Sequence, residues 1–142
     1  YYEPRTVHES SLSPCIHSVL ASKLDYTEKA YELFLRTSRL DLDDYNREVH
    51  EGLHITSMAG TWIALVQGFG GMRVENDTLT FRPYVPKEWK GFEFSIVFRG
   101  ARIQIKSSQS GIEVQSNKAI DIKVWNSDVS LDGKNSVLVQ TK

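Results

Sequence analysis

The sequence predicts an α+β fold in which helices come first and a small antiparallel β-sandwich follows. Two observations lead to this class. Apolar residues recur with a period close to 3.6 over residues 1–73, and they alternate with a period of two over residues 74–142. The change of period, at roughly residues 70–78, marks a linker. Because helices and strands are segregated along the chain, we expect either one α+β domain or two domains, 1–73 and 74–142.

The first half of the chain contains signals for three helices. Ser13 precedes Pro14, the order typical of an N-cap followed by the first helical residue. The apolar residues that follow repeat at helical spacing: Ile16, Val19, Leu20 and Leu24. A second helix is expected over about residues 27–40, with Thr27 as its N-cap. A third is expected over about residues 56–67, and the glycines that follow it are typical of a helix C-terminus.

The second half of the chain alternates apolar and polar residues in short runs, as strands with one buried face do. The alternating apolar positions are Phe92, Phe94, Ile96 and Phe98, then Ala101, Ile103 and Ile105, then Ile112 and Val114, then Ile120, Ile122 and Val124, then Val137 and Val139. Turn dipeptides separate the runs, and Asp132-Gly133 is of the kind found in two-residue hairpins. Short strands at this spacing predict an antiparallel sandwich.

The composition excludes several classes of function. Lys and Arg number 17 against 18 Asp and Glu, so the net charge of −1 gives no reason to expect a nucleic-acid partner. The longest apolar stretches are too short to span a bilayer, and no signal peptide is expected. The single Cys15 cannot form an internal disulfide and has no Cys or His partner at metal-ligand spacing. We therefore expect a cytoplasmic protein that holds no metal and no cofactor.

Two stretches combine a histidine, hydroxyl side chains and the start of a predicted helix. The residues concerned are His8, Ser10, Ser11 and Ser13 in VHESSLSP, and Gly52, His54, Thr56 and Ser57 in GLHITS. A helix N-terminus offers unpaired N–H groups and a partial positive charge, which together favour an anion. The two stretches can therefore form a cradle for a phosphate. The alternative is that the hydroxyls are ordinary N-caps and the histidines are structural.

Several carboxylates also allow two interpretations. The acidic loop after the second predicted helix can bind a cation, or it can simply be solvated; its members are Asp41, Asp43 and Asp44. Glu9 and Glu51 can be a catalytic pair of the kind that glycosidases use. Each of them can equally interact with a nearby helix N-terminus through its charge.

The tryptophans allow similar alternatives. Trp62 lies in the apolar part of the third predicted helix together with Phe69, and both are expected in the core. Trp89 and Trp125 lie in the strand-rich half, where they can stack on a sugar or pack within the sandwich. A sugar-binding module would need such aromatic side chains on an exposed face.

Three runs of this sequence resemble the C-terminal end of glycoside hydrolase family 65, the family of maltose, trehalose, kojibiose and nigerose phosphorylases. They are EPRTVHESSLSPCIHSVLA, AYELFLRTSRLDLDDYN and EGLHITSMAGTWIALVQGFGGMRV. The resemblance extends into LTFRPYVPKEWKGFEFSIVFRGARIQI, whereas about the last 35 residues are generic. It implies that residues 1–73 form the last helices of an (α/α)6-barrel and that residues 74–142 form a C-terminal β-sandwich. Because the chain starts on Tyr-Tyr, we expect it to be part of a longer protein.

The resemblance also implies a reaction and a site. Family members catalyse inverting phosphorolysis, in which phosphate attacks an α-linked glucosyl disaccharide and β-glucose 1-phosphate results, without a further cofactor. The family's phosphate-binding residues correspond here to Ser10, Ser11 and His54, and less closely to their neighbours Thr56 and Ser57. The family's general acid and sugar-binding Lys–Gln pair lie upstream of this chain.

The chain alone is therefore expected to be inactive and to need the preceding part of the protein, and homo-oligomers are expected. Two other functions stay open at this point. A hydrolase of the same family would place a carboxylate base where phosphate binds, and Glu9 and Glu51 are the candidates for it. A non-catalytic carbohydrate-binding or structural β-sandwich with a helical extension is the other alternative.

Overall fold

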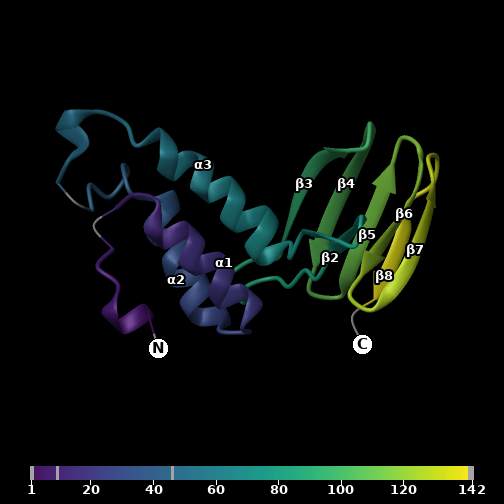
Figure 1. Ribbon diagram of the computed structural model, residues 1–142, viewed down its shortest axis with the longest axis horizontal. Coiled ribbons are helices and arrows are strands. Elements are labelled where there is room, and N and C mark those ends of the chain that lie inside the picture. Colours follow the sequence, from purple (N-terminus) through teal and green to yellow (C-terminus); the bar gives the residue numbers. More distant parts are fainter. Residues whose placement is uncertain (1, 9, 46, 141–142) are drawn as a thin grey trace. The chain divides into compact units, whose positions relative to one another are not determined.

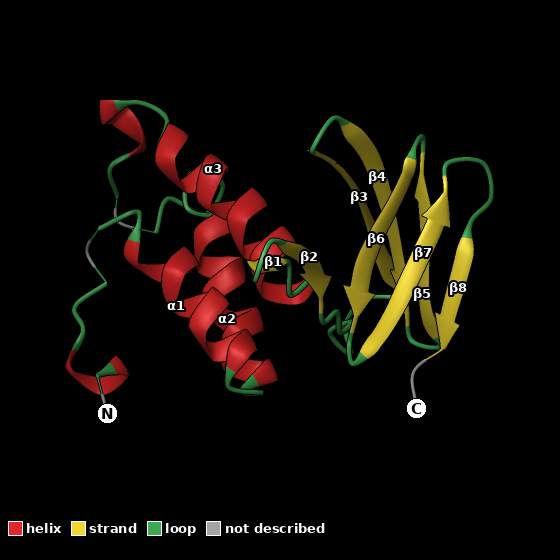
Figure 2. Ribbon diagram, turned by 45° about the vertical axis from the view of Figure 1, so that its right-hand side comes forward, coloured by secondary structure: helices red, strands yellow, loops and turns green. Residues whose placement is uncertain are grey.

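The computed structural model describes residues 2–8, 10–45 and 47–140. The chain divides into two compact units, Tyr1–Gly68 and Phe69–Lys142. The first unit is helical and the second consists of strands, as the colours of Figure 2 show. No helix among the described residues is both long enough and apolar enough to cross a membrane.

The helical unit contains three α-helices, α1 (Ser13–Lys23), α2 (Thr27–Ser38) and α3 (Ile55–Ile63), as labelled in Figure 1. Short 3-10 helices, η1 (Glu3–Arg5) and η2 (Val49–Glu51), precede α1 and α3. A π-helical segment, η3 (Ala64–Phe69), continues directly from α3. The three predicted helices are therefore confirmed, and the third is longer than expected because its last turns widen to the π form.

The predicted N-caps Ser13 and Thr27 are wrong by one position. Leu12 precedes α1 and Tyr26 precedes α2, and neither makes a side-chain cap bond. The Ser13 hydroxyl lies instead 2.7 Å from Nδ1 of His8. The histidine thus competes for the hydroxyl that would otherwise cap the helix.

Small side chains let the three helices approach closely. The Ser18 hydroxyl on α1 donates to the Ala30 carbonyl on α2 at 2.8 Å. Gly60 on α3 lies so near α1 that a Cβ atom there would be 2.9 Å from both Cβ and Sγ of Cys15. The apolar core of this unit comes largely from α1 and α2: Cys15, Val19, Ala21, Ala30, Leu33 and Phe34.

Phe69 is fully buried as expected, but the expectation for Trp62 is wrong because 48% of it is exposed.

Strands form two four-stranded sheets that face each other in the second unit (Figure 2). The first sheet has the order β1 (Arg73–Glu75), β2 (Thr78–Phe81), β6 (Ala119–Val124) and β7 (Ser127–Asp132). The second has the order β3 (Gly91–Phe98), β4 (Ala101–Ser108), β5 (Gly111–Ser116) and β8 (Val137–Gln140). Alternation of buried and exposed residues along β4 matches the predicted period of two.

Two details of the sandwich differ from the prediction. The strands β2 and β6 pair in parallel, so the sheets are not purely antiparallel. The strands β3, β4 and β5 of the other sheet come between them in sequence, so no hairpin turn fixes their direction. Asp132-Gly133 does not form a hairpin either, because β7 and β8 belong to different sheets. The Asp132 carboxylate instead accepts hydrogen bonds from the backbone of Lys134 and Asn135, and this turn carries the chain between the sheets.

Candidate functional site

The two predicted phosphate-binding stretches meet in the helical unit. The Ser11 hydroxyl, in the turn before α1, lies 2.9 Å from the Thr56 hydroxyl in the first turn of α3. These residues are 45 positions apart in the sequence, and Thr56 is exposed while Ser11 is half-buried. The structure therefore brings one hydroxyl from each stretch together at the surface.

The other two predicted hydroxyl residues lie on either side of this contact. Ser10 is exposed, and its hydroxyl accepts a long hydrogen bond of 3.3 Å from the backbone N–H of Leu12. Ser57 is buried, and its hydroxyl donates to the Thr37 carbonyl on α2 at 2.9 Å. Ser10 thus presents its hydroxyl to solvent, whereas Ser57 uses its own to attach α3 to α2.

His54 is held by a carboxylate from the acidic loop after α2. One oxygen of Asp41 lies 2.6 Å from Nδ1 of His54, and the other accepts the backbone N–H of His54 at 2.9 Å. This two-point contact fixes both the backbone and the ring. The second ring nitrogen, Nε2, has the Glu48 carboxylate at 3.6 Å, which is longer than a hydrogen bond. Nε2 therefore faces a second carboxylate in an ion pair, and an anion bound at this nitrogen would take the place of Glu48.

The same contact sets the charge of the pair. The hydrogen bond that the Asp41 carboxylate accepts from the ring raises the pKa of His54 above its ordinary value, and the nearby charges of Asp41 and Glu48 act in the same direction. The hydrogen bond from His54 in turn lowers the pKa of Asp41. The imidazolium form of His54 therefore persists to higher pH than in a free histidine, and it can donate from Nε2 to an anion.

His8 makes a separate cluster rather than joining Ser11. Its Nδ1 is paired with the Ser13 hydroxyl, and its Nε2 lies 3.2 Å from the carboxylate of Glu3. His17 on α1 contacts the same carboxylate at 2.6 Å. Among the described residues, this is the only group of His, Cys, Asp and Glu side chains with the proximity that a metal ion needs.

The remaining sequence candidates are dispersed. Glu9 lies outside the described residues, and Glu51 is exposed beside His50, 3.9 Å away. In the strand unit, Trp89 packs edge-on against Phe69 and Phe92. The indole N–H of Trp125 donates to the Pro83 carbonyl. Both tryptophans are partly buried, and these contacts are those of side chains that pack within the sandwich.

Comparison with known proteins identifies the family of this chain. Residues 1–63 match the family model of the glycosyl hydrolase family 65 central catalytic domain, and residues 72–131 match that of the glycosyl hydrolase family 65 C-terminal domain. The chain belongs to glycoside hydrolase family 65. The predicted family is thereby confirmed.

Several relatives of this family 65 chain are named as phosphorylases of disaccharides. It is 47% identical over 136 residues to the maltose phosphorylase of Bacillus subtilis, a match that covers 94% of this chain and 18% of the relative. It is 52% identical over 112 residues to the α,α-trehalose phosphorylase of Thermoanaerobacter brockii, which covers 79% of this chain and 14% of the relative. The chain therefore spans less than a fifth of the length of these two relatives.

A solved structure supports the fold. It is described provisionally as a kojibiose phosphorylase from the human microbiome, and it is 38% identical with a TM-score of 0.93. The match covers 100% of this family 65 chain and 21% of that chain. The helices and the two sheets therefore correspond to part of a larger phosphorylase-like structure, and the complete barrel is not visible within these residues.

Two contacts of the site were not predicted from the sequence. The sequence suggests Asp41 only as a cation ligand. Its contact with His54 is not predicted, because no spacing rule connects residues 13 positions apart. The sequence does not indicate Glu3 as a candidate for any site. In the structure two histidines and one lysine lie beside its carboxylate: His8, His17 and Lys29. A carboxylate beside a proline at the start of the helical part was the only local signal, and by itself it indicates nothing more than a helix start.

Proposed function

We propose that this chain is the C-terminal part of an inverting disaccharide phosphorylase and that it supplies groups that bind inorganic phosphate. The parent enzyme converts an α-linked glucosyl disaccharide and phosphate to β-glucose 1-phosphate and glucose. The observation that carries the proposal is the contact between the hydroxyls of Ser11 and Thr56. Thr56 lies two residues after His54, whose ring is held by Asp41. The names of the relatives, maltose phosphorylase and α,α-trehalose phosphorylase, support the same reaction class.

Phosphate would be bound by hydroxyls and one imidazole. Ser10, Ser11 and Thr56 donate hydrogen bonds through O–H groups, and His54 donates through Nε2. Because the hydroxyls are neutral and only His54 carries a positive charge, the phosphate keeps much of its negative charge and remains a nucleophile. Phosphate binding by Ser57 stays a prediction. Its buried hydroxyl also donates to the Thr37 carbonyl and so attaches α3 to α2.

The remaining chemistry belongs to the preceding part of the enzyme. An inverting reaction needs an acid that protonates the leaving oxygen on one face of the sugar and a nucleophile on the other. In our proposal phosphate takes the place of the attacking water, and this chain positions it. The general acid comes from the preceding part, so the chain alone has no activity.

The experiment that tests the proposal uses the full-length parent protein. Maltose, α,α-trehalose and kojibiose are each supplied with and without inorganic phosphate, and β-glucose 1-phosphate and free glucose are followed. We expect cleavage of one disaccharide to require phosphate and to release equal amounts of the two products. Release of two glucose molecules without phosphate would identify a hydrolase and would contradict the proposal.

A pair of histidine variants tests the assigned residue. His54→Ala is expected to raise the KM for phosphate at least about tenfold, because a charge-assisted hydrogen bond to the anion is lost. The KM for the disaccharide should stay within about twofold. His50→Ala is the matched control, since the His50 side chain is 76% exposed and lies 3.9 Å from the Glu51 carboxylate. Equal losses for both substrates in His54→Ala would contradict the role.

A further inference from the structure

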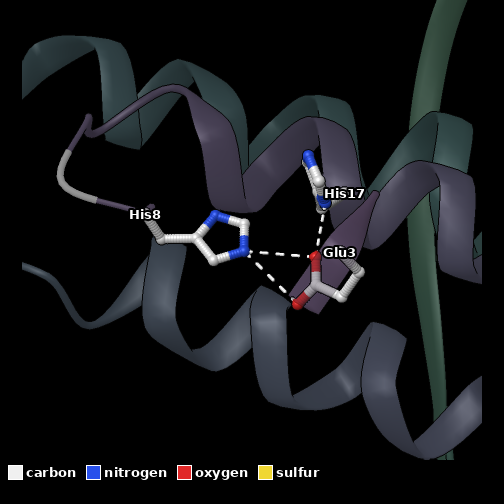
Figure 3. A group of neighbouring side chains, drawn as sticks. All are labelled: Glu3, His8 and His17. Carbon is white, nitrogen blue, oxygen red and sulfur yellow. Dashed lines mark hydrogen bonds and ion pairs between the residues drawn. The ribbon is translucent and has the colours of Figure 1, made fainter. Parts of the chain in front are cut away.

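Glu3, His8 and His17 form a compact cluster that the phosphate site does not use. Glu3 lies on η1, His8 in the loop that follows, and His17 on the first half of α1. One carboxylate oxygen and one nitrogen of each ring all lie within 4.8 Å of one another. Figure 3 shows both imidazole rings directed at the carboxylate from different sides.

The histidines are held in this orientation. The Ser13 hydroxyl, 2.7 Å from Nδ1 of His8, leaves Nε2 of that ring facing Glu3. The Arg36 guanidinium donates to the backbone carbonyl of His8 and fixes the loop. The two rings meet edge to face with their centroids 4.8 Å apart. A second hydrogen bond on the far nitrogen is the usual support of a histidine that ligates a metal.

Exposure also suits a bound ion. The side chain of His8 is 9% exposed and that of His17 is 22% exposed, whereas Glu3 is 34% exposed. The two nitrogens are thus largely shielded from water, and the carboxylate side is open enough for a water molecule to complete a coordination shell. Two imidazoles, one carboxylate and one water are a ligand set typical of Zn²⁺.

One positive charge lies near the cluster and has another partner. Lys29 Nζ is 3.3 Å from Glu3, but it also donates to both carboxylate oxygens of Glu32 at 3.0 and 3.2 Å. If a cation bound at Glu3, Lys29 would still have the Glu32 carboxylate as a partner. The arrival of a metal ion therefore does not leave the ammonium group without a counter-charge.

We propose that Glu3, His8 and His17 form a site for a divalent transition metal, with Zn²⁺ as the ion that best fits these ligands. In the structure the three groups contact one another directly. An ion would separate them slightly, since metal–ligand distances of about 2.0–2.2 Å replace the direct contacts. The bound ion would connect residues 2–8 to α1, just before the phosphate-binding serines.

The test is a titration of the chain with metal after treatment with a chelator. Co²⁺ is the spectroscopic probe, because a tetrahedral site with nitrogen and oxygen ligands gives it visible absorption bands. We expect one equivalent of Co²⁺ to bind with a dissociation constant in the micromolar range or below. One equivalent of Zn²⁺ should abolish the bands and should raise the melting temperature, because it binds only the folded chain.

Variants assign the ligands. Glu3→Gln and His17→Ala are each expected to weaken Co²⁺ binding at least about 100-fold, since outer-shell partners alone change metal affinity by about 10- to 100-fold. Ser13→Ala should weaken it about tenfold. His50→Ala, an exposed histidine outside the cluster, should leave it unchanged. Far-UV circular dichroism shows which variants remain folded.

Two results would overturn the proposal. One is the absence of stoichiometric Co²⁺ binding to the unsubstituted chain, a result that does not depend on the folding of any variant. The other is binding that His50→Ala weakens as much as His17→Ala does. Either would leave the cluster as an ion-pair network that holds residues 2–8 against the helices.

Discussion

The Ser11 hydroxyl lies 2.9 Å from the Thr56 hydroxyl, and this contact joins the turn before α1 to the first turn of α3. Next to Thr56 in the sequence, the buried Ser57 hydroxyl donates to the Thr37 carbonyl on α2. Two neighbouring hydroxyl residues thus point in different directions, one outward and one into the helical unit. Their substitutions should therefore have different consequences, one for phosphate and one for stability.

Ser57→Ala is expected to lower the free energy of unfolding by about 1–2 kcal/mol, because the Thr37 carbonyl loses a buried donor. Thr56→Val keeps the shape of an exposed side chain and should change stability by less than about 0.5 kcal/mol. In the full-length enzyme, Thr56→Val should instead raise the KM for phosphate. Urea unfolding and phosphate kinetics measure the two effects. A larger stability loss in Thr56→Val than in Ser57→Ala would contradict this assignment.

Asp41→Asn is expected to lower the pKa of His54 toward its ordinary value of 6.5, because Asp41 is the largest cause of the upward shift. The titration of the His54 ring by NMR measures this directly. In the full-length enzyme the rise of the KM for phosphate with pH should begin at a lower pH in the variant, since the imidazolium form is lost at a lower pH. Asp43→Asn is the matched control in the same loop, where Asp43 pairs with Arg39 instead. An unchanged His54 pKa in Asp41→Asn would contradict the assignment of Asp41 as the cause of the raised pKa.

The pair also predicts how stability depends on pH. His54 has a raised pKa, so its contribution is fully present below about 6.5 and is lost as the pH rises through the raised value. Asp41 has a lowered pKa, so its contribution is present above about 3.8 and is lost as the pH falls through the lowered value. The stability difference between the unsubstituted chain and Asp41→Asn should therefore be largest between these two limits. Urea midpoints measured across and above this range test it, and a difference that grows as the pH rises above about 6.5 would have the wrong sign.

The sequence predicts most helices and strands, but it does not predict which strands or side chains far apart in the sequence come into contact. Periodicity located the helices and most strands because each element buries one face, and that face repeats along the chain. The parallel pairing of β2 with β6 carries no such local signal, and neither does the position of β8 beside β5. The site shows the same division. The motifs predict His54 and Ser11 as candidate site residues, and this stays a prediction. No motif predicts the contact of Asp41 with His54, because it forms only when the loop after α2 folds against residue 54.

Gly60→Ala tests the close packing of α3 on α1. An added Cβ would lie 2.9 Å from Cβ and Sγ of Cys15, which is closer than carbon and sulfur atoms approach. We expect a loss of about 1–3 kcal/mol in the free energy of unfolding, which exceeds the gain of about 1 kcal/mol in helix propensity. Gly68→Ala is the control, because its nearest neighbour would be the Ser22 hydroxyl at 3.2 Å, a single side-chain atom. Equal stability of the Gly60→Ala variant and the unsubstituted chain would show that α3 can shift without cost.

One apolar stripe on α1 predicts how the isolated chain behaves in solution. Ile16, Leu20 and Leu24 follow one another at four-residue spacing, and they are 49%, 50% and 63% exposed. Such a stripe on a helix is typical of a surface that another element covers, and the chain spans only 18% of the Bacillus subtilis relative. We expect the chain to self-associate at micromolar concentrations, with the weight-average mass in sedimentation velocity rising with concentration.

The double variant Ile16→Lys with Leu20→Lys should restore a monomer, because lysine keeps the helix propensity and adds charge to the stripe. The matched control is Val97→Lys with Leu138→Lys, which places the same charges on the exposed β3 and β8 residues of the strand unit. In the full-length protein the α1 variant should instead lower stability, since the stripe would there be covered. If the α1 variant associates as strongly as the unsubstituted chain while the control becomes monomeric, the strand unit, and not α1, holds the association surface.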